Sequence, residues 1–168
     1  MKEIYFAGGC FWGAQHLFEQ VNGVKETETG FANGNSENPT YEEVYTDKTG
    51  FAETVRVVYD ENIVSLRRLL DFFFMAIDPT SLNKQGEDEG TRYRTGVYAS
   101  SEDDLAIVSD FIAEKQKETD GEIVVEVELL RNYYPASEYH QHYLEKHPDG
   151  YCHLPWELFK KVHEESRK

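Results

Sequence analysis

The sequence contains no long apolar run and only two cysteines. No stretch approaches the ~18 consecutive apolar residues that a helix needs to cross a bilayer. The N-terminal segment MKEIYFAGGC has too few apolar residues and too little positive charge for a secretory signal. We therefore expect a cytoplasmic protein in which Cys10 and Cys152 are reduced thiols, and their wide separation rules out a CxxC motif.

Basic residues are also scarce. Lys and Arg total 17 and Asp and Glu total 32, which gives a formal net charge of −15. A field of this sign repels nucleic acids and anionic lipids, so neither is an expected partner. The acidic residues are spread along the chain, and 168 residues suit one folded unit. We expect a single domain over residues 1–168 and a monomer.

Hydrophobic periodicity predicts the order of the elements. Strands are expected at the ranges 2–7, 24–32, 53–59 and 95–99, and helices at 11–21 and 63–77. The resulting order, β-α-β-β-α-β, is that of an α+β ferredoxin-like two-layer sandwich, with two helices on one face of an antiparallel sheet. A helix capped by Ser101 and a strand at 122–130 would be additions to this plan.

Three segments are expected to be irregular. Residues 33–50 and 80–92 form two long polar excursions. Loops of such length in compact domains usually have a function. Residues 133–168 are expected to be loosely ordered, with one short helix from 136 to 147.

The motif GGCFWG, residues 8–13, places Cys10 where a strand turns into a helix. The positive end of the helix should favour a reactive thiolate. Gly8 and Gly9 allow a tight turn and would leave room for a substrate, while Phe11 and Trp12 would wall an apolar pocket. The alternative is a buried cysteine packed behind a glycine turn.

Two acids and two phenols in or beside the polar excursions are further candidates: Glu53, Asp88, Tyr41 and Tyr93. If they converge on the thiol, they would donate protons and hydrogen bonds to a substrate oxygen. The alternative is that these acids are merely solvated.

The block EYHQHYLEKHPDGYCHLP, residues 138–155, places four histidines near Cys152. A zinc site is disfavoured because the segment has one thiol and neither a CxxC nor an HExxH pattern. Cys152 follows an Asp149-Gly150 turn, so it suits a partner that closes a disulfide with an oxidised Cys10. It is otherwise an incidental cysteine.

Five blocks occur in an order that resembles the A-type peptide methionine sulfoxide reductases. They are GGCFWG, NPTYEEV, TGFAE–VRVVYD, DPT–QG–D–GTRYRT–VY and YHQHYLEKHPDGYCH. The resemblance runs from about residue 3 to about residue 156. It implies reduction of the S epimer of methionine sulfoxide, free or in proteins, regeneration by thioredoxin, and no metal or organic cofactor.

The resemblance also implies roles for particular residues. Cys10 would be the nucleophile that becomes a sulfenic acid, and Cys152 the recycling cysteine. Phe11 and Trp12 would hold the S-methyl group. The set that holds the sulfoxide oxygen would be Tyr41, Glu53, Asp88 and Tyr93, with Glu53 as the proton donor.

Some positions depart from the usual family pattern: Gln15, Phe31, Asn33, Phe51, Glu87 and Arg92. None belongs to the catalytic set, so we expect them to change the rate and the pH profile rather than the reaction.

Two other functions fit the residues. One is a thiol hydrolase with a Cys10–His140 pair, which would need no reductant. The other is a ferredoxin-like binding module whose aromatic side chains contact proteins. A structure that places the side chains of Cys10 and Glu53 on opposite sides of the molecule, with no shared cavity, would exclude the reductase mechanism.

Overall fold

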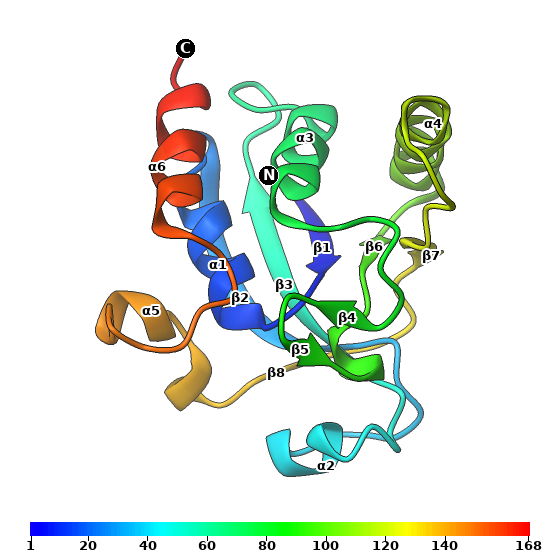
Figure 1. The fold of residues 1–168 in the computed structure, drawn as a ribbon, viewed down its shortest axis with the longest axis vertical. Helices are drawn as coiled ribbons and strands as arrows, with labels where there is room; N and C mark the ends of the chain where they lie inside the picture. The colour runs from blue at the N-terminus through cyan, green and yellow to red at the C-terminus, as the bar shows by residue number, and fades with distance from the viewer.

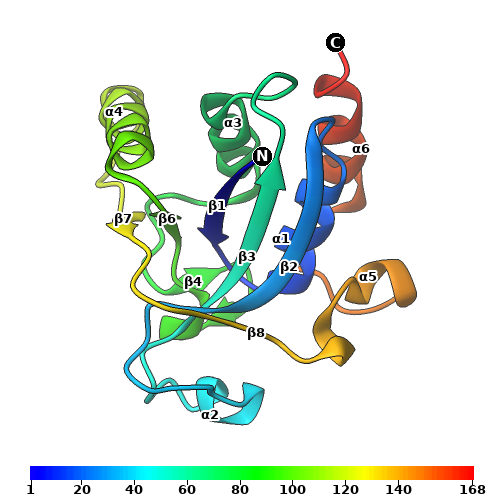
Figure 2. The ribbon, with the colours of Figure 1, turned by 180° about the vertical axis from the view of Figure 1, so that it is seen from behind.

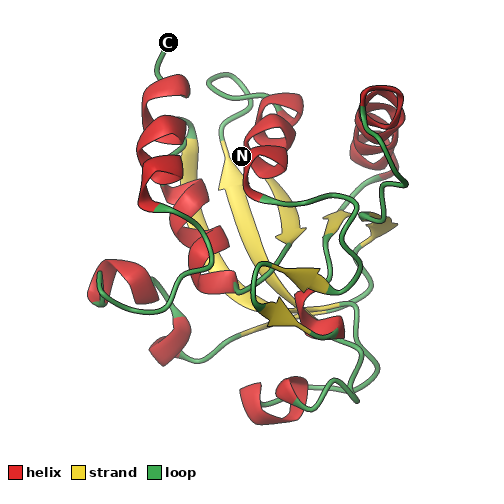
Figure 3. Ribbon diagram, in the orientation of Figure 1, coloured by secondary structure: helices red, strands yellow, loops and turns green.

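The computed structural model describes residues 1–168 and is built around a six-stranded, mostly antiparallel sheet (Figures 1 and 3). The strand order is β7-β6-β1-β3-β2-β8, and only the β6–β7 pair is parallel. The strands are β1 (Lys2–Ala7), β2 (Val24–Ala32), β3 (Ala52–Tyr59), β6 (Gly96–Ala99), β7 (Glu126–Leu129) and β8 (Tyr133–Pro135). A separate two-stranded ladder pairs β4 (Lys84–Gln85) with β5 (Asp88–Glu89).

Four helices lie on one side of the sheet: two pack on it directly, a third packs against these two, and a fourth contacts β6 and β7 (Figures 1 and 2). They are α1 (Phe11–Glu19), α3 (Leu66–Ala76), α6 (Trp156–Glu165) and α4 (Glu102–Glu118). Shorter helical segments are α2 (Tyr41–Tyr45), α5 (Tyr143–Lys146), and the 3-10 turns η1 (Thr91–Tyr93) and η2 (Glu138–His140).

The main core lies between the sheet and these helices. Phe6 of β1 stacks on Phe18 of α1 at 4.5 Å and contacts Phe73 of α3 at 5.0 Å, and all three rings are buried. Burial of each such side chain stabilises the fold by about 1.5–3 kcal/mol. On the other face a smaller cluster that includes Tyr5 and Tyr98 packs against Tyr133. The sheet is thus anchored on both faces, and β1 and α1 are fixed around Cys10.

The mixed α+β class and the four predicted N-terminal strands are confirmed. Ser101 caps α4 as expected, since its hydroxyl accepts a hydrogen bond from the Asp104 N–H. The predicted helix at 63–77 begins later, at Leu66. Asn62, which the sequence offers as the cap of that helix, lies in a turn over residues 60–64. Ser65 is the N-cap instead, because its hydroxyl accepts a hydrogen bond from the Arg68 N–H.

The expectation of a loosely ordered C-terminal segment is wrong. Helix α6 occupies 156–165 and buries Phe159 and Val162 against its neighbours. The single helix predicted at 136–147 is interrupted, because His142 has a left-handed backbone (φ 53°) between η2 and α5.

The two polar excursions also contain regular structure. The first holds α2, whose capping box joins Thr40 and Glu43, and the second holds β4, β5 and η1. The predicted strand at 122–130 is shorter, at 126–129. None of the helices combines the length and the apolar character that a membrane span requires.

Candidate active site

Cys10 is the N-cap residue of α1 and follows a Gly8-Gly9 turn at the end of β1. Gly9 has φ 72°, a conformation that favours glycine. The sequence suggested that the two glycines leave room for a substrate, but the structure shows that they do not. A Cβ atom at Gly8 would lie 2.9 Å from Ile77, and one at Gly9 would lie 2.6 Å from Nε2 of His153. These positions therefore admit the protein's own side chains.

Glu53 lies directly beside Cys10. Strand β3 pairs with β2, and in this pairing Glu53 lies opposite Phe31. The Glu53 side chain reaches the first turn of α1. The Phe11 backbone N–H donates a hydrogen bond to Oε1 of Glu53 at 3.1 Å, whereas Oε2 has no partner. The side chains of residues 10 and 53 are therefore on the same side of the molecule, and the condition that would exclude the mechanism is not met.

Burial controls the pKa of Glu53, which is only 1% exposed. Loss of hydration raises the pKa to about 8, although the Phe11 N–H and the charge of Arg92 act in the opposite direction. A carboxyl group with this pKa retains its proton at neutral pH for most of the time. It is suited to act as a general acid.

The thiol does not have the low pKa that the helix terminus predicted. Cys10 is 6% exposed, and burial followed by the nearby charge of Glu53 raises its pKa well above the ordinary value. The Trp12 N–H lowers the pKa, as expected for a helix terminus, but its effect is smaller. Desolvation of the sulfur therefore outweighs the helix terminus.

The other polar candidates converge on the same point. Burial and then the charge of Glu53 raise the pKa of Tyr93 to about 12, and the pKa of Tyr41 is raised for the same two reasons. Asp88 contributes to the raised pKa of both Cys10 and Glu53. The structure thus brings these five residues within electrostatic reach of one another.

An aromatic cavity adjoins this cluster. Its volume is about 640 Å³, and its lining includes Trp12, Phe31, Tyr41, Tyr139 and His140. Trp12 stacks on the Tyr143 ring at 3.7 Å, and its Nε1–H donates to Nδ1 of His140 at 3.2 Å. Of the two predicted pocket residues, Trp12 lines the cavity, whereas Phe11 is buried behind it.

Cys152 lies against the first turn of α1. A Cβ atom at Gly13 would be 3.1 Å from its Sγ, and this sulfur accepts a hydrogen bond from the Leu154 N–H at 3.4 Å. Both cysteines are free. The Cys152 charge also contributes to the raised pKa of Cys10, so the two thiols are near neighbours.

Sequence reasoning missed the place of Arg92. It forms an ion pair with Asp47, and its guanidinium lies 4.1 Å from the Tyr45 ring and 4.3 Å from the Tyr93 ring. The sequence marked it only as a departure from the family pattern. Its proximity to Glu53 depends on how η1 folds back over β3, which no local pattern reveals.

Sequence reasoning also gave no role to Tyr151 or His153. The Tyr151 hydroxyl donates to Oδ1 of Asp88 at 2.6 Å, and the His153 side chain is 4% exposed. The one available signal was that these residues flank Cys152.

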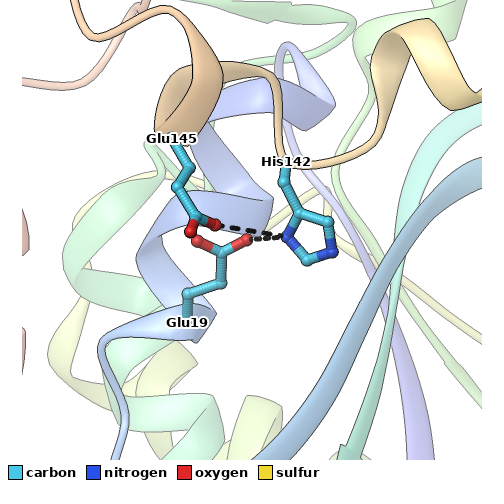
Figure 4. Close-up of side chains that lie close together, drawn as sticks. All are labelled: Glu19, His142 and Glu145. Atoms are coloured by element: carbon cyan, nitrogen blue, oxygen red, sulfur yellow. Dashed lines mark hydrogen bonds and ion pairs between the residues drawn. The ribbon is translucent and has the colours of Figure 1, made fainter.

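The four histidines near Cys152 do not come together. Each meets a different partner: His140 meets Trp12, His142 meets Glu19, His147 meets Tyr143, and His153 meets Gly9. Figure 4 shows the one mixed group, Glu19, His142 and Glu145, whose ligand atoms lie within 4.8 Å of one another. The ion pair of 2.6 Å between His142 and Glu19 accounts for this arrangement, and the catalytic candidates are not part of it.

Comparison with known proteins identifies the family. The family model "Peptide methionine sulfoxide reductase" matches residues 2–168. The peptide methionine sulfoxide reductase MsrA of Clostridium acetobutylicum is 51% identical over 161 residues, covering 96% of this chain and 99% of that protein.

Two solved structures extend the comparison. The reduced form of Mxr1 from Saccharomyces cerevisiae matches with a TM-score of 0.86 and 39% identity, covering 90% of this chain and 88% of that chain. Mxr1 in complex with Trx2 matches with a TM-score of 0.61 and 29% identity over 84% of each chain.

The protein is therefore an oxidoreductase. It belongs to the A-type peptide methionine sulfoxide reductase family, and it is an enzyme rather than a binding module.

Proposed function

We propose that this enzyme reduces methionine-S-sulfoxide by attack of the Cys10 thiolate on the sulfoxide sulfur while Glu53 protonates the oxygen. One observation carries the proposal: the buried Glu53 carboxyl is hydrogen-bonded to the residue that follows Cys10 and keeps its second oxygen unpaired. A sulfoxide sulfur is a weak electrophile until its oxygen gains a proton. A thiol beside a protonated acid meets that requirement.

The neighbouring residues suit the same step. Tyr41 and Tyr93 have raised pKa values, so their hydroxyls stay protonated and can donate hydrogen bonds to the sulfoxide oxygen. Asp88 would complete the set of residues around this oxygen. Trp12 would contact the S-methyl group from the cavity wall, with Phe11 closing the pocket behind it. Release of methionine would leave Cys10 as a sulfenic acid.

Cys152 would complete the cycle. Its sulfur attacks the sulfenic sulfur of Cys10, water leaves, and an intramolecular disulfide forms. The position of Cys152 against the first turn of α1 supports this step. An external dithiol must then open the disulfide. The Mxr1–Trx2 complex of a relative supports thioredoxin as that partner.

The hydrolase alternative has less support. It requires a histidine that takes the proton from Cys10, and His140 already uses Nδ1 to accept a hydrogen bond from Trp12.

The strand order β6-β1-β3-β2 with antiparallel pairing supports a ferredoxin-like unit within a single domain over residues 1–168.

One experiment tests the reaction. The protein is incubated with the separated S and R epimers of a methionine sulfoxide and with dithiothreitol, and methionine release is measured. We expect turnover of the S epimer alone, its loss in Cys10→Ser, and a decrease of ~10²–10⁴ in the chemical step of Glu53→Gln. Turnover of the R epimer, or an active Cys10→Ser variant, would refute the proposal.

A second experiment tests the recycling step. Cys152→Ser should release one methionine per enzyme and then stop when thioredoxin is the only reductant. Continued cycling of this variant with thioredoxin at the full rate would exclude Cys152 as the recycling residue.

A further inference from the structure

The carboxylate of Asp88 faces the segment that carries Cys152. Its Oδ1 accepts the Tyr151 hydroxyl at 2.6 Å, and its Oδ2 lies 3.6 Å from Nδ1 of His153. This separation is too long for a hydrogen bond, and neither this Oδ2 nor this Nδ1 has a hydrogen-bond partner, although both atoms are buried. Two residues that flank Cys152 on either side are therefore directed at a single carboxylate.

His153 occupies a space that two glycines leave open. A Cβ atom at Gly9 would lie 2.6 Å from its Nε2, and one at Gly13 would lie 3.3 Å from its Cε1. These glycines stand on either side of Cys10 in the chain. The imidazole is almost fully buried, with 4% of the side chain exposed. Its packing therefore joins the recycling segment to the turn that presents the nucleophile.

The same packing fixes Cys152. Its Sγ would be 3.1 Å from the Cβ position at Gly13, which also lies 3.4 Å from Nδ1 of His153. The thiol and the imidazole thus rest on the same point of α1. The Asp88 contacts and the packing of the imidazole therefore both act on the chain at the position where Cys152 lies.

We propose that Tyr151 and His153 form a latch on Asp88, Gly9 and Gly13 that holds the Cys152 thiol beside Cys10 before the substrate is reduced. This inference rests on the proposed role of Cys152 as the recycling residue. In this role His153 and Tyr151 are positioning residues, because they act through Cys152 and not on the substrate.

The latch acts on a defined chemical step. An S–S bond forms between Cys152 and Cys10, and the S–O bond of the sulfenic acid breaks. The sulfenic sulfur is reduced, the Cys152 sulfur is oxidised, and the thiol proton and the hydroxyl group leave as water. No other reactant is needed. Holding two reacting groups in place raises their effective concentration, so a released segment should close the disulfide more slowly.

The test separates the two halves of the cycle. His153→Asn and Tyr151→Phe are mixed with one equivalent of substrate in rapid-quench experiments. Methionine release and the lifetime of the Cys10 sulfenic acid, trapped with a dimedone-type reagent, are both measured. His163→Ala is the matched control, because it removes an exposed histidine of α6 that lies outside the latch.

We expect methionine release within about twofold of the parent enzyme in all three variants. The sulfenic acid should live at least about tenfold longer in His153→Asn and about threefold longer in Tyr151→Phe, with no change in His163→Ala. A general structural defect would slow both halves together, whereas the latch predicts a change in one. Tyr151→Phe removes a single oxygen from a side chain that is 45% exposed, so it tests the latch even if His153→Asn does not fold.

Sulfenic acid that disappears at the parental rate in Tyr151→Phe and His153→Asn would overturn the latch. Failure of the underlying function has a different signature. Cys152→Ser would then keep cycling with thioredoxin at the parental rate, whereas a failed latch alone leaves Cys152→Ser blocked at the sulfenic acid.

Discussion

The backbone N–H of Phe11 holds one carboxyl oxygen of Glu53 at 3.1 Å and leaves the other oxygen unpaired. The donor belongs to the residue after Cys10, so the acid is positioned by the same helix start that presents the thiol. Since the charge of Glu53 also raises the pKa of Cys10, proton binding at the two groups is linked. The reactive form has one proton on Glu53 and none on Cys10.

This pairing predicts a bell-shaped pH profile. The reactive form is a minor arrangement of the singly protonated pair. Because the pKa of Glu53 is about 8 and that of Cys10 is raised well above its ordinary value, kcat/KM should rise with pH through about 8. It should fall again above the pKa of the thiol. Tyr93, with a pKa of about 12, stays protonated over the rising limb.

Glu53→Gln supplies the control for this profile. Without the carboxyl group, the remaining activity should depend on thiolate formation alone, so kcat/KM should rise to a plateau. A falling limb that persists in Glu53→Gln would assign the acid role to another group. Steady-state kinetics with one substrate, from pH 6 to the alkaline limit at which the enzyme stays folded, measures both profiles.

Local patterns carried most of the fold prediction. The alternation of Val55, Val57 and Tyr59 predicted β3, and these side chains are buried in the core. The strands and helices of the first hundred residues are set by such short-range signals, so their order was predictable. Helix α6 was missed because only Phe159 and Val162 mark its buried side in a segment rich in Lys and Glu.

The candidate site was predictable in its members but not in its electrostatics. Each of Cys10, Glu53 and Cys152 stands in a recognisable motif. The direction of the shift in the thiol pKa depends on burial by residues distant in sequence, and the sequence alone does not give that burial.

The role of Gln15 also depends on residues distant in sequence. It is buried, donates to Thr27 and accepts from the His142 N–H, a bridge between α1 and a segment over 120 residues away.

The raised pKa of Glu53 also predicts how stability depends on pH. The folded protein favours the protonated acid, so the stabilisation is fully present below the unfolded pKa near 4.5 and is lost as pH rises through about 8. Glu53→Gln lacks this loss. Its free energy of unfolding, compared with the parent, should increase between pH 5 and pH 8.5 by on the order of a few kcal/mol.

Urea unfolding at the two pH values measures this difference. Glu37→Gln is the control, since Glu37 is an exposed carboxylate in the loop before α2. The same pH-dependent gain in both variants, or none in Glu53→Gln, would contradict a buried acid at position 53.

Arg92 should set the position of the rising limb. Its charge lowers the pKa of Glu53, and its guanidinium is enclosed by Asp47 and two tyrosine rings. Arg92→Gln removes the charge and keeps a hydrogen-bonding side chain, so the midpoint of the rising limb should move upward by about half a pH unit or more. Arg67→Gln, which removes a surface arginine of α3, is the control. An unchanged or lowered midpoint in Arg92→Gln would remove Arg92 from the electrostatics of the acid.

Trp12 should determine how tightly the substrate is held. Its ring lines the cavity and is fixed by the Tyr143 stack and by the hydrogen bond to His140. Trp12→Phe keeps an apolar wall but loses the hydrogen bond and part of the contact area, which corresponds to about 0.6–1.4 kcal/mol of binding. We expect KM to rise about three- to tenfold with a smaller change in kcat. Trp156→Phe is the control, because Trp156 lies on α6 and does not line this cavity; it should leave KM unchanged. Equal effects of the two substitutions would mean that the cavity beside Trp12 does not receive the substrate.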